Sequence, residues 1–600
     1  MDVRSNARSV DFIEQGYGVD DDESEPPGPP DPPDPKGRDR RKILATGLGG
    51  SALAALGWLA KSRLIDRSDT PPPPSNGPRK AAFRAADAGG FTSREESYTA
   101  GKPADDSAAV LYPSASEAAR LTKVTVPTIL ATDDPVLHLL RRTTYGLTPD
   151  LVDEVHGQGI DAWLATQLNP IEIPDPEADV VWNTYPGASM EPAQVQRSMA
   201  RNAHDAMSDY SLATLGRMIW SKRQLHEVVV DFWANHFNVP MTILSSWDVG
   251  VSFQNDVIRT HALGSFTDML LATMQHPGML RYLSNALSNK TSVNENLGRE
   301  LLELHTVGIG AGYTEDDVRN SAYILTGRTV ANTESGAEGT FLYDPNKHWT
   351  GAVQVLDFTD PNASAAGGFD VGDAYLRYLA NHPSTAQAIA RKLAVRFVSD
   401  NPPQSLVDRL ATAYLDGGTA IVPVFDIMFR SGEFWAAVGQ KTRRPMENQM
   451  ASIRALGLAP DAQTPELLDT MYLWLEKRLG QSPVGWRSPN GYPDVQAAWP
   501  SASGLLETWN THRRLVQGWD GYTAAPASNL IGDRSQATVG DYIDSLCLRV
   551  CFQTFLPPHR DALLGFVGAD AATPTDQSNL QDLVQHVVPL VLDSPYFALR

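Results

Sequence analysis

Within residues 294–308, NENLGRELLELHTVG, two carboxylates, an amide and a guanidinium are spaced so that a helix would bring them together. The segment holds strong helix formers and no proline, and glycines follow it, so the sequence predicts a helix over residues 294–306. At about 100° per residue its polar side chains share one face. We call this face the polar stripe; it consists of Asn296, Arg299, Glu300 and Glu303. These are the predicted catalytic residues, because two carboxylates can act as general acid and base on a glycan or ester when burial separates their pKa values.

The polar stripe also has interpretations that need no catalysis. Arg299 and Glu303 stand four residues apart, the spacing of an ion pair on a solvated helix, which contributes only about 0.2 to 0.5 kcal/mol. The stripe can equally form a buried polar network that specifies how helices pack. The sequence leaves these alternatives open.

Two histidines connect the polar stripe with metal chemistry. His305 ends the helical segment, and His236 lies in the aromatic-rich run FWANHF of residues 232–237. Imidazole together with a carboxylate suits Zn²⁺, Mn²⁺ or iron, so we predict His236, Glu300 and His305 as ligands of a divalent metal. The alternative is that both histidines are hydrogen-bonded core residues, since His305 shares a helix face with Leu297, Leu301 and Leu304.

A long connection rich in glycine, proline and aromatic residues spans residues 480–500. We call it the 480–500 loop. It is longer than a simple connection between helices requires, which is typical of a binding loop. The alternative is an irregular cover over the core. The predicted substrate-binding residues come from this loop and from the aromatic-rich run: Trp233, Asn235, Asn490, Tyr492 and Asp494.

The elements that must position these groups are helices. Amphipathic periodicity recurs to the C-terminus, so the sequence predicts a mainly α fold with a large multi-helix domain over residues 128–600. Only residues 340–358 alternate in the manner of strands, which predicts one small β-hairpin or sheet. The only cysteines, Cys547 and Cys551, lie one helical turn apart and are expected to be two buried thiols.

Charge and motifs exclude several functions. The formal net charge of −21 argues against nucleic acid as a partner, because phosphate binding needs a basic surface. The sequence contains no G-x-S-x-G elbow, no P-loop, no Rossmann glycine pattern and no H-E-x-x-H zinc helix. Any catalysis would therefore use a site of another kind.

The N-terminal region predicts export. Residues 1–37 are acidic and proline-rich, and residues 63–127 form a linker rich in alanine, proline and serine. We expect both to be disordered, because neither composition can build a packed core. Between them, residues 38–62 carry two arginines before an apolar segment and resemble a twin-arginine (Tat) signal. The resemblance implies the Tat machinery as a partner and an extracytoplasmic location, either secreted or tethered to the membrane through an uncleaved segment, residues 43–60.

Motifs spread from about residue 134 to the C-terminus resemble one bacterial family. The most specific are HPGML from His276, the segment from Asn294 and YTEDDV from Tyr313, and the FWANHF run and PNGYPD in the 480–500 loop are similar too. Together they resemble the family catalogued as domain of unknown function 1800. The resemblance implies an exported, mainly helical protein. Such proteins are often encoded beside a second exported family with an alkaline-phosphatase-like fold, which the resemblance suggests as a partner.

Two hypotheses about function follow. The first is an exported, metal-dependent, hydrolase-like enzyme that acts on a cell-surface polymer or ester. The second is a non-catalytic protein that binds such a polymer or assembles with another exported protein. They differ in whether acidic and imidazole groups from separate helices meet in one water-accessible cleft.

Overall fold

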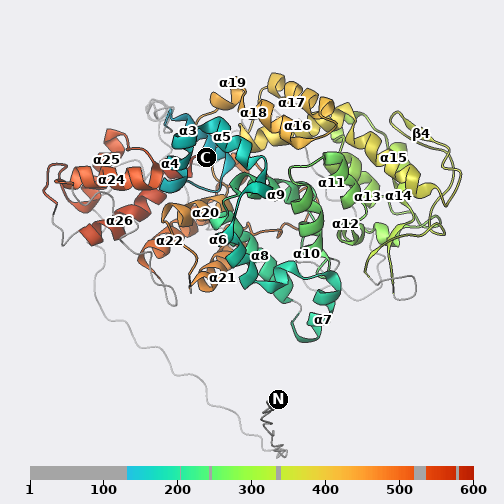
Figure 1. Cartoon of the computed structure of the whole chain (residues 1–600), viewed down its shortest axis with the longest axis horizontal. Coiled ribbons are helices and arrows are strands. Elements are labelled where there is room, and N and C mark those ends of the chain that lie inside the picture. Colours follow the sequence, from blue (N-terminus) through green and yellow to red (C-terminus); the bar gives the residue numbers. More distant parts are fainter. Residues whose placement is uncertain are drawn as a thin grey trace, which may run out of the picture. The chain divides into compact units, whose positions relative to one another are not determined.

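The computed structural model describes residues 132–202, 204–241, 246–332, 339–461, 463–518, 536–575 and 580–600 (Figure 1). Helices dominate this part of the chain, and its strands form two small antiparallel sheets of two strands each. The predicted mainly α class is therefore confirmed. The predicted leader, Tat-like signal and linker, over residues 1–127, lie outside the described residues.

The first helices begin at residues that the sequence marks as caps. The Asp134 side chain accepts from the backbone N–H of Val136, and Thr148 does the same for Leu151, which pairs N–H groups that the first helical turn leaves free. Proline follows each cap, where its fixed φ suits helix entry. The helices of this region are α3 (Pro135–Thr143), α4 (Pro149–Gln158), α5 (Ile160–Gln167), α6 (Pro176–Thr184), α7 (Pro192–Asn202), α8 (His204–Trp220) and α9 (Gln224–His236).

The middle of the chain combines short helices with both sheets. The helices are α10 (Gly250–Ser252), α11 (Phe266–Thr273), α12 (Pro277–Tyr282), α13 (Asn296–Glu300) and α14 (Glu315–Leu325). The predicted β segment, residues 340–358, contributes strands to two hairpins. Its first strand pairs with a strand that precedes the segment in the sequence. The pairs are β1 (Arg328–Val330) with β2 (Phe341–Tyr343), and β3 (Val353–Val355) with β4 (Phe358–Asp360).

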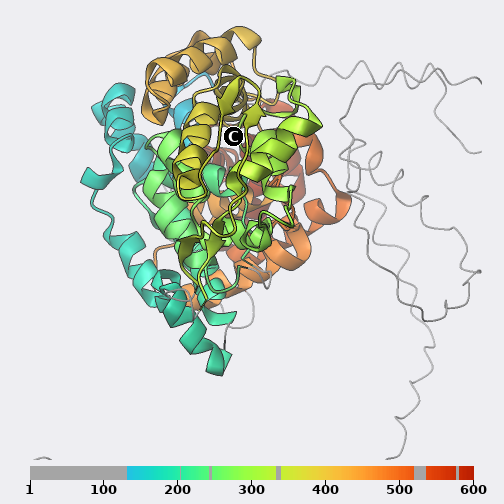
Figure 2. The same cartoon turned by 90° about the vertical axis from the view of Figure 1, so that its right-hand side faces the viewer.

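Among the remaining helices, α16 packs on α17 and α17 on α18, whereas α20 and α21 pack on α8 and α22 packs on α26. Figure 2 shows α16, α17 and α18 at the top, while α24 and α26 pack together elsewhere (Figure 1). The helices are α15 (Gly368–Ala380), α16 (Pro383–Phe397), α17 (Gln404–Asp416), α18 (Ile421–Phe429), α19 (Gly432–Trp435), α20 (Pro445–Ala455), α21 (Thr464–Trp474), α22 (Ala502–Gln517), α24 (Val539–Cys551), α25 (Pro557–Val567), α26 (Leu580–Leu592) and α27 (Pro595–Ala598).

Three π-helical segments interrupt the regular helices: η3 (Phe253–Arg259), η5 (Leu301–His305) and η7 (Leu475–Leu479). Such segments often occur at functional sites. The predicted helix of residues 294–306 is therefore α13 continued by η5. Short 3₁₀ turns complete the described elements: η1 (Pro170–Glu172), η2 (Pro186–Ser189), η4 (Asn285–Leu287), η6 (Ile309–Ala311) and η8 (Gln496–Ala498).

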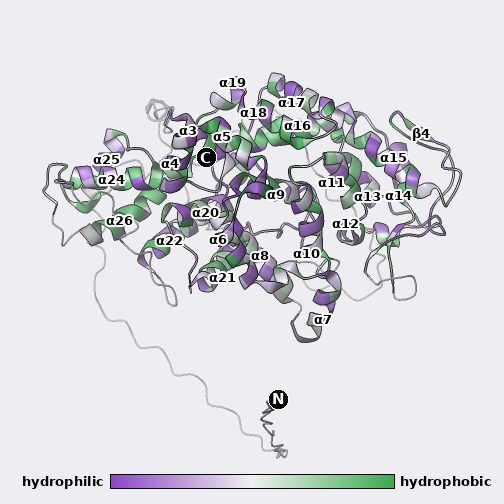
Figure 3. Cartoon of the chain, in the orientation of Figure 1, coloured by the Kyte–Doolittle hydropathy of each residue, from purple (hydrophilic) through white to green (hydrophobic). Residues whose placement is uncertain are grey.

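Most helices are amphipathic, and Figure 3 shows apolar and polar residues on opposite sides of α16 and α17. Their apolar sides join one continuous core that includes Trp163, Trp233 and Phe237. Cys547 and Cys551 are buried in it as free thiols. No helix in the described ranges is both long and apolar enough to cross a membrane.

Candidate functional site

His236 of α9 and His305 of η5 face each other in the core. Their ring centroids lie 5.8 Å apart. Nε2 of His236 is 3.2 Å from the carbonyl oxygen of His305, and Nδ1 of His305 is 3.1 Å from the carbonyl oxygen of His236. A carbonyl oxygen only accepts, so these two nitrogens carry the protons. The lone pairs of the neutral rings are therefore on His236 Nδ1 and His305 Nε2.

Lys392 of α16 binds this histidine pair. Its Nζ donates to Nδ1 of His236 at 3.0 Å and to the carbonyl oxygen of Leu304 at 2.9 Å. Burial, together with the positive charge of Lys392, holds the pKa of His236 well below its ordinary value and lowers the pKa of His305 to about 3. Both imidazoles are therefore neutral at physiological pH. Burial of its ammonium group also lowers the pKa of Lys392, to about 8.

The structure does not assemble the predicted metal centre. In the part of the chain that it describes, no three His, Cys, Asp or Glu side chains gather closely enough to hold a metal ion. His236 meets the ammonium of Lys392, and Nε2 of His305 is buried without a hydrogen-bond partner. Glu300 stays partly exposed on α13 while His305 turns into the core. Among the described residues, the structure therefore does not bring His236, Glu300 and His305 together as a set of metal ligands.

The polar stripe forms an ion-pair network at the surface. Arg299 donates to both carboxylate oxygens of Glu315, at 3.0 and 2.6 Å, and lies 3.5 Å from Glu303. Asn296 donates to the carbonyl oxygen of Leu283 at 3.4 Å. This arrangement matches the solvated-helix interpretation, in which each exposed pair contributes about 0 to 1 kcal/mol.

Glu300 is the member of the polar stripe whose environment suits an acid. Burial and the charge of Glu303 raise its pKa, against the opposing effect of Arg299. Burial, with a contribution from the charge of Glu300, likewise raises the pKa of Tyr282. The Tyr282 hydroxyl donates to the carbonyl oxygen of Arg487 at 2.7 Å. Tyr282 therefore links the surroundings of Glu300 with the 480–500 loop.

Two asparagines at the end of α9 hold the 480–500 loop. Asn235 donates to the carbonyl oxygen of Tyr492 at 2.8 Å and accepts from the Tyr492 N–H at 2.6 Å. Asn238 donates to the carbonyl oxygens of Trp486 and Ser488, at 2.9 and 2.7 Å. These bonds fix the loop backbone on both sides of residue 487.

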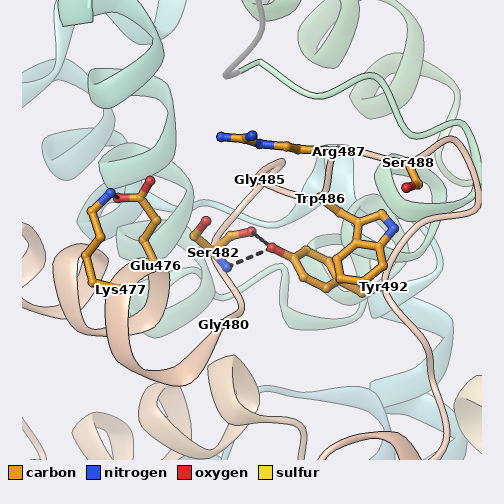
Figure 4. A pocket seen from close by; sticks show the side chains of 9 residues that line it. All are labelled: Glu476, Lys477, Gly480, Ser482, Gly485, Trp486, Arg487, Ser488 and Tyr492. Atoms are coloured by element: carbon orange, nitrogen blue, oxygen red, sulfur yellow. Dashed lines mark hydrogen bonds and ion pairs between the residues drawn. The ribbon is translucent and has the colours of Figure 1, made fainter. Parts of the chain in front are cut away.

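The fixed loop encloses one side of a pocket of about 460 Å³, which we call the loop pocket. Figure 4 shows Trp486 and Tyr492 on one side and Glu476 and Lys477 of η7 on the other. The two aromatic ring centroids are 4.9 Å apart. The Tyr492 hydroxyl is engaged with the backbone N–H and carbonyl oxygen of Ser482, at 3.1 and 3.3 Å. The full lining is Glu476, Lys477, Gly480, Ser482, Gly485, Trp486, Arg487, Ser488 and Tyr492.

The predicted substrate-binding residues take different positions around the loop pocket. Tyr492 lines it, Asn235 holds the Tyr492 backbone, and Asn490 accepts from the Trp486 indole N–H at 2.9 Å. Trp233 is fully buried and donates to the carbonyl oxygen of Ala262 at 2.9 Å. Trp233 therefore lies in the core and does not line the loop pocket.

Asp494 faces an ionic network beneath the loop. Lys441 lies 3.4 Å from its carboxylate and donates to its carbonyl oxygen at 2.9 Å. Arg396 lies 3.7 Å from Asp494 and also pairs with Glu447, which Arg444 approaches to 3.3 Å. Burial opposes ionisation of Glu447, but the surrounding arginines hold its pKa well below the ordinary value. Asp494 is therefore a structural anchor of the loop in this arrangement.

Sequence reasoning missed Asn238, Lys392 and Arg487. Asn238 stands two residues after His236, so the same run could have suggested it. Lys392 and Arg487 carry no local pattern, because their neighbours come from segments far away in the chain.

The comparison with protein families matches residues 138–599 to a family described as Protein of unknown function (DUF1800). The chain belongs to the DUF1800 family. The DUF1800 match includes α9, the histidine pair, Lys392 and the whole 480–500 loop. No curated protein and no solved structure matches the chain.

Proposed function

We propose that this DUF1800 protein is a binding protein whose loop pocket holds a saccharide chain of a cell-surface polymer. The observation that carries the proposal is the pairing of an aromatic wall, Trp486 and Tyr492, with charged groups opposite, Glu476 and Lys477. A sugar ring presents apolar C–H faces and polar edges. An aromatic ring can cover such a face while charged groups bond the hydroxyls.

The surroundings of the loop pocket suit a polymer. Lys477, Gly480, Arg487 and Ser488 are exposed, so the pocket opens to solvent and a chain can extend beyond it. The hydrogen bonds from Asn235 and Asn238 fix the loop before any ligand binds. A preformed site spends less free energy on ordering its own residues when the ligand arrives.

Hydrolysis of the bound polymer is the second candidate function. It is favoured by Glu300, whose raised pKa suits a general acid, and by Tyr282, which links Glu300 with the loop. On this proposal Glu300→Gln would abolish turnover of a bound oligosaccharide and leave its affinity unchanged. Retained turnover in that variant would eliminate Glu300 as the acid.

Export through a Tat-like signal, attachment to the membrane and assembly with an alkaline-phosphatase-like partner belong to the same proposal. They rest on the N-terminal residues and on the family resemblance. A cell-surface polymer as ligand requires that the loop pocket reach the outside of the cytoplasmic membrane. Cell fractionation of the native strain, with and without the two arginines of residues 40–41, tests that requirement.

The binding proposal is tested by the affinity of the purified full chain for an array of bacterial oligosaccharides. We expect binding that Trp486→Ala weakens by about tenfold or more, equivalent to about 1.4 kcal/mol. Trp486→Phe should keep much of the affinity because it keeps an aromatic face. Trp509→Ala is the matched control, since Trp509 is a partly exposed tryptophan of α22 that does not line the pocket.

Two outcomes would overturn the binding proposal. One is an array on which the folded wild-type chain binds nothing. The other is a Trp486→Ala variant with wild-type affinity. Far-ultraviolet circular dichroism establishes that each variant is folded before its affinity is measured.

A further inference from the structure

The charges that line the loop pocket do not cancel. Glu476 and Lys477 form an ion pair at 3.0 Å and neutralise each other. Arg487 also lines the pocket, and among the described residues its guanidinium has neither an ion-pair nor a hydrogen-bond partner. Figure 4 shows this side chain extending from the Trp486 side of the pocket toward Glu476 and Lys477. The pocket therefore carries one unpaired positive charge.

This charge is opposite in sign to the net charge of the molecule. The chain has a formal net charge of −21, so its general field repels anions. Arginines elsewhere on the surface commonly have acidic partners, as Arg299 has Glu315 and Arg409 has Glu433. An unpaired guanidinium beside an aromatic wall is a fixed fork of donors that matches a carboxylate or phosphate.

The backbone that carries Arg487 is held in place. The Tyr282 hydroxyl donates to the carbonyl oxygen of Arg487, and Asn238 donates to the carbonyl oxygens of its two neighbours, Trp486 and Ser488. Three consecutive carbonyl groups are therefore bonded to the body of the protein. The Arg487 side chain consequently extends from a fixed backbone position next to the Trp486 ring.

We propose that the saccharide in the loop pocket is acidic and that Arg487 binds its anionic group, a carboxylate or a phosphate. This inference rests on the proposed saccharide binding and adds the class of sugar. Arg487 acts as the residue that selects acidic over neutral chains, while Trp486 supplies the contact common to both. Nucleic acid is a poorer ligand, because the one unpaired cation among the described residues that line the pocket cannot neutralise several phosphates.

The test uses the full chain and three probes: tetragalacturonate, its methyl ester and the same ester carrying one phosphate group. The plain ester has the same sugar skeleton without the charge. We expect tetragalacturonate or the phosphorylated ester to bind about tenfold more tightly than the neutral ester at low salt. The preferred acidic probe shows whether the anion is a carboxylate or a phosphate. Added salt should reduce this preference, because the charges are exposed.

Arg487→Gln should lower the affinity for the acidic probe to that for the ester and leave ester binding unchanged. The exposed side chain has no hydrogen-bond or ion-pair partner among the described residues, so the variant should unfold at the wild-type temperature. Arg513→Gln is the matched control, because Arg513 is an exposed arginine of α22 outside the pocket. It should keep the wild-type preference.

The outcomes separate this inference from the proposed function. Equal binding of acidic and neutral probes, or a preference that survives Arg487→Gln, overturns the acidic class while saccharide binding stands. Failure of the wild-type chain to bind any of the probes or any saccharide on the array overturns both.

Discussion

Asn235→Ala should release the 480–500 loop from the body of the protein. The side chain makes two hydrogen bonds to the Tyr492 backbone, at 2.8 and 2.6 Å. Each such bond contributes about 1 kcal/mol, and an unpaired N–H or C=O adds to the loss. We therefore expect the free energy of local opening at Tyr492 to fall by about 2 kcal/mol, which corresponds to roughly 30-fold faster hydrogen exchange.

The assay is hydrogen–deuterium exchange with mass spectrometry on peptides that cover residues 480–500. Peptides from α16 and α17 should keep their wild-type exchange, because the lost bonds are local. The affinity of the loop pocket for its saccharide should fall with the opening of the loop.

Two further variants sharpen this test. Asn381→Ala is the matched control, since Asn381 is an exposed asparagine whose amide bonds only to its own helix, at the carbonyl oxygen of Arg377. In the Asn381→Ala variant, hydrogen exchange of the loop peptides should equal that of the wild type. Asn235→Asp keeps the acceptor and loses the donor, so it should give an intermediate rate. Wild-type exchange at Tyr492 in Asn235→Ala would refute the view that this side chain holds the loop.

Two other predictions concern the glycines of the 480–500 loop and the carboxyl group of Glu300. Gly491 has φ +69°, and a Cβ there would overlap the carbonyl oxygen of Asn235, so Gly491→Ala should destabilise the protein by about 3 kcal/mol in urea unfolding. Gly480 has φ +72° and open space around it, so Gly480→Ala should lower the free energy of unfolding by only about 1 kcal/mol. If both variants lost the same free energy of unfolding, the overlap at Gly491 would be contradicted. The raised pKa of Glu300 means that folding penalises its ionised form, and stability falls as pH rises through the folded pKa. Glu300→Gln should therefore stabilise the protein at pH 7 by less than about 1 kcal/mol, and thermal unfolding below pH 4 should show no difference; a loss at both pH values would refute the sign.

The sequence alone determined the fold class and the first residues of helices that begin at a recognisable cap. Asp134 and Thr148 cap helices as their types and following prolines predict, and within the 480–500 loop only the short 3₁₀ turn η8 is regular. These features depend on neighbours a few residues away, which the sequence displays directly. The polar stripe was likewise visible as a set of residues on one helix face.

Only the tertiary structure decided which groups meet. His305 pairs with His236, which also binds Lys392, instead of joining Glu300, because η5 follows i to i+5 hydrogen bonds and because α9 supplies the facing side chain. The bond from Asn238 to the Trp486 carbonyl oxygen joins residues 248 positions apart. Spacing along the chain carries no information about such contacts, since they depend on how whole helices pack around the core.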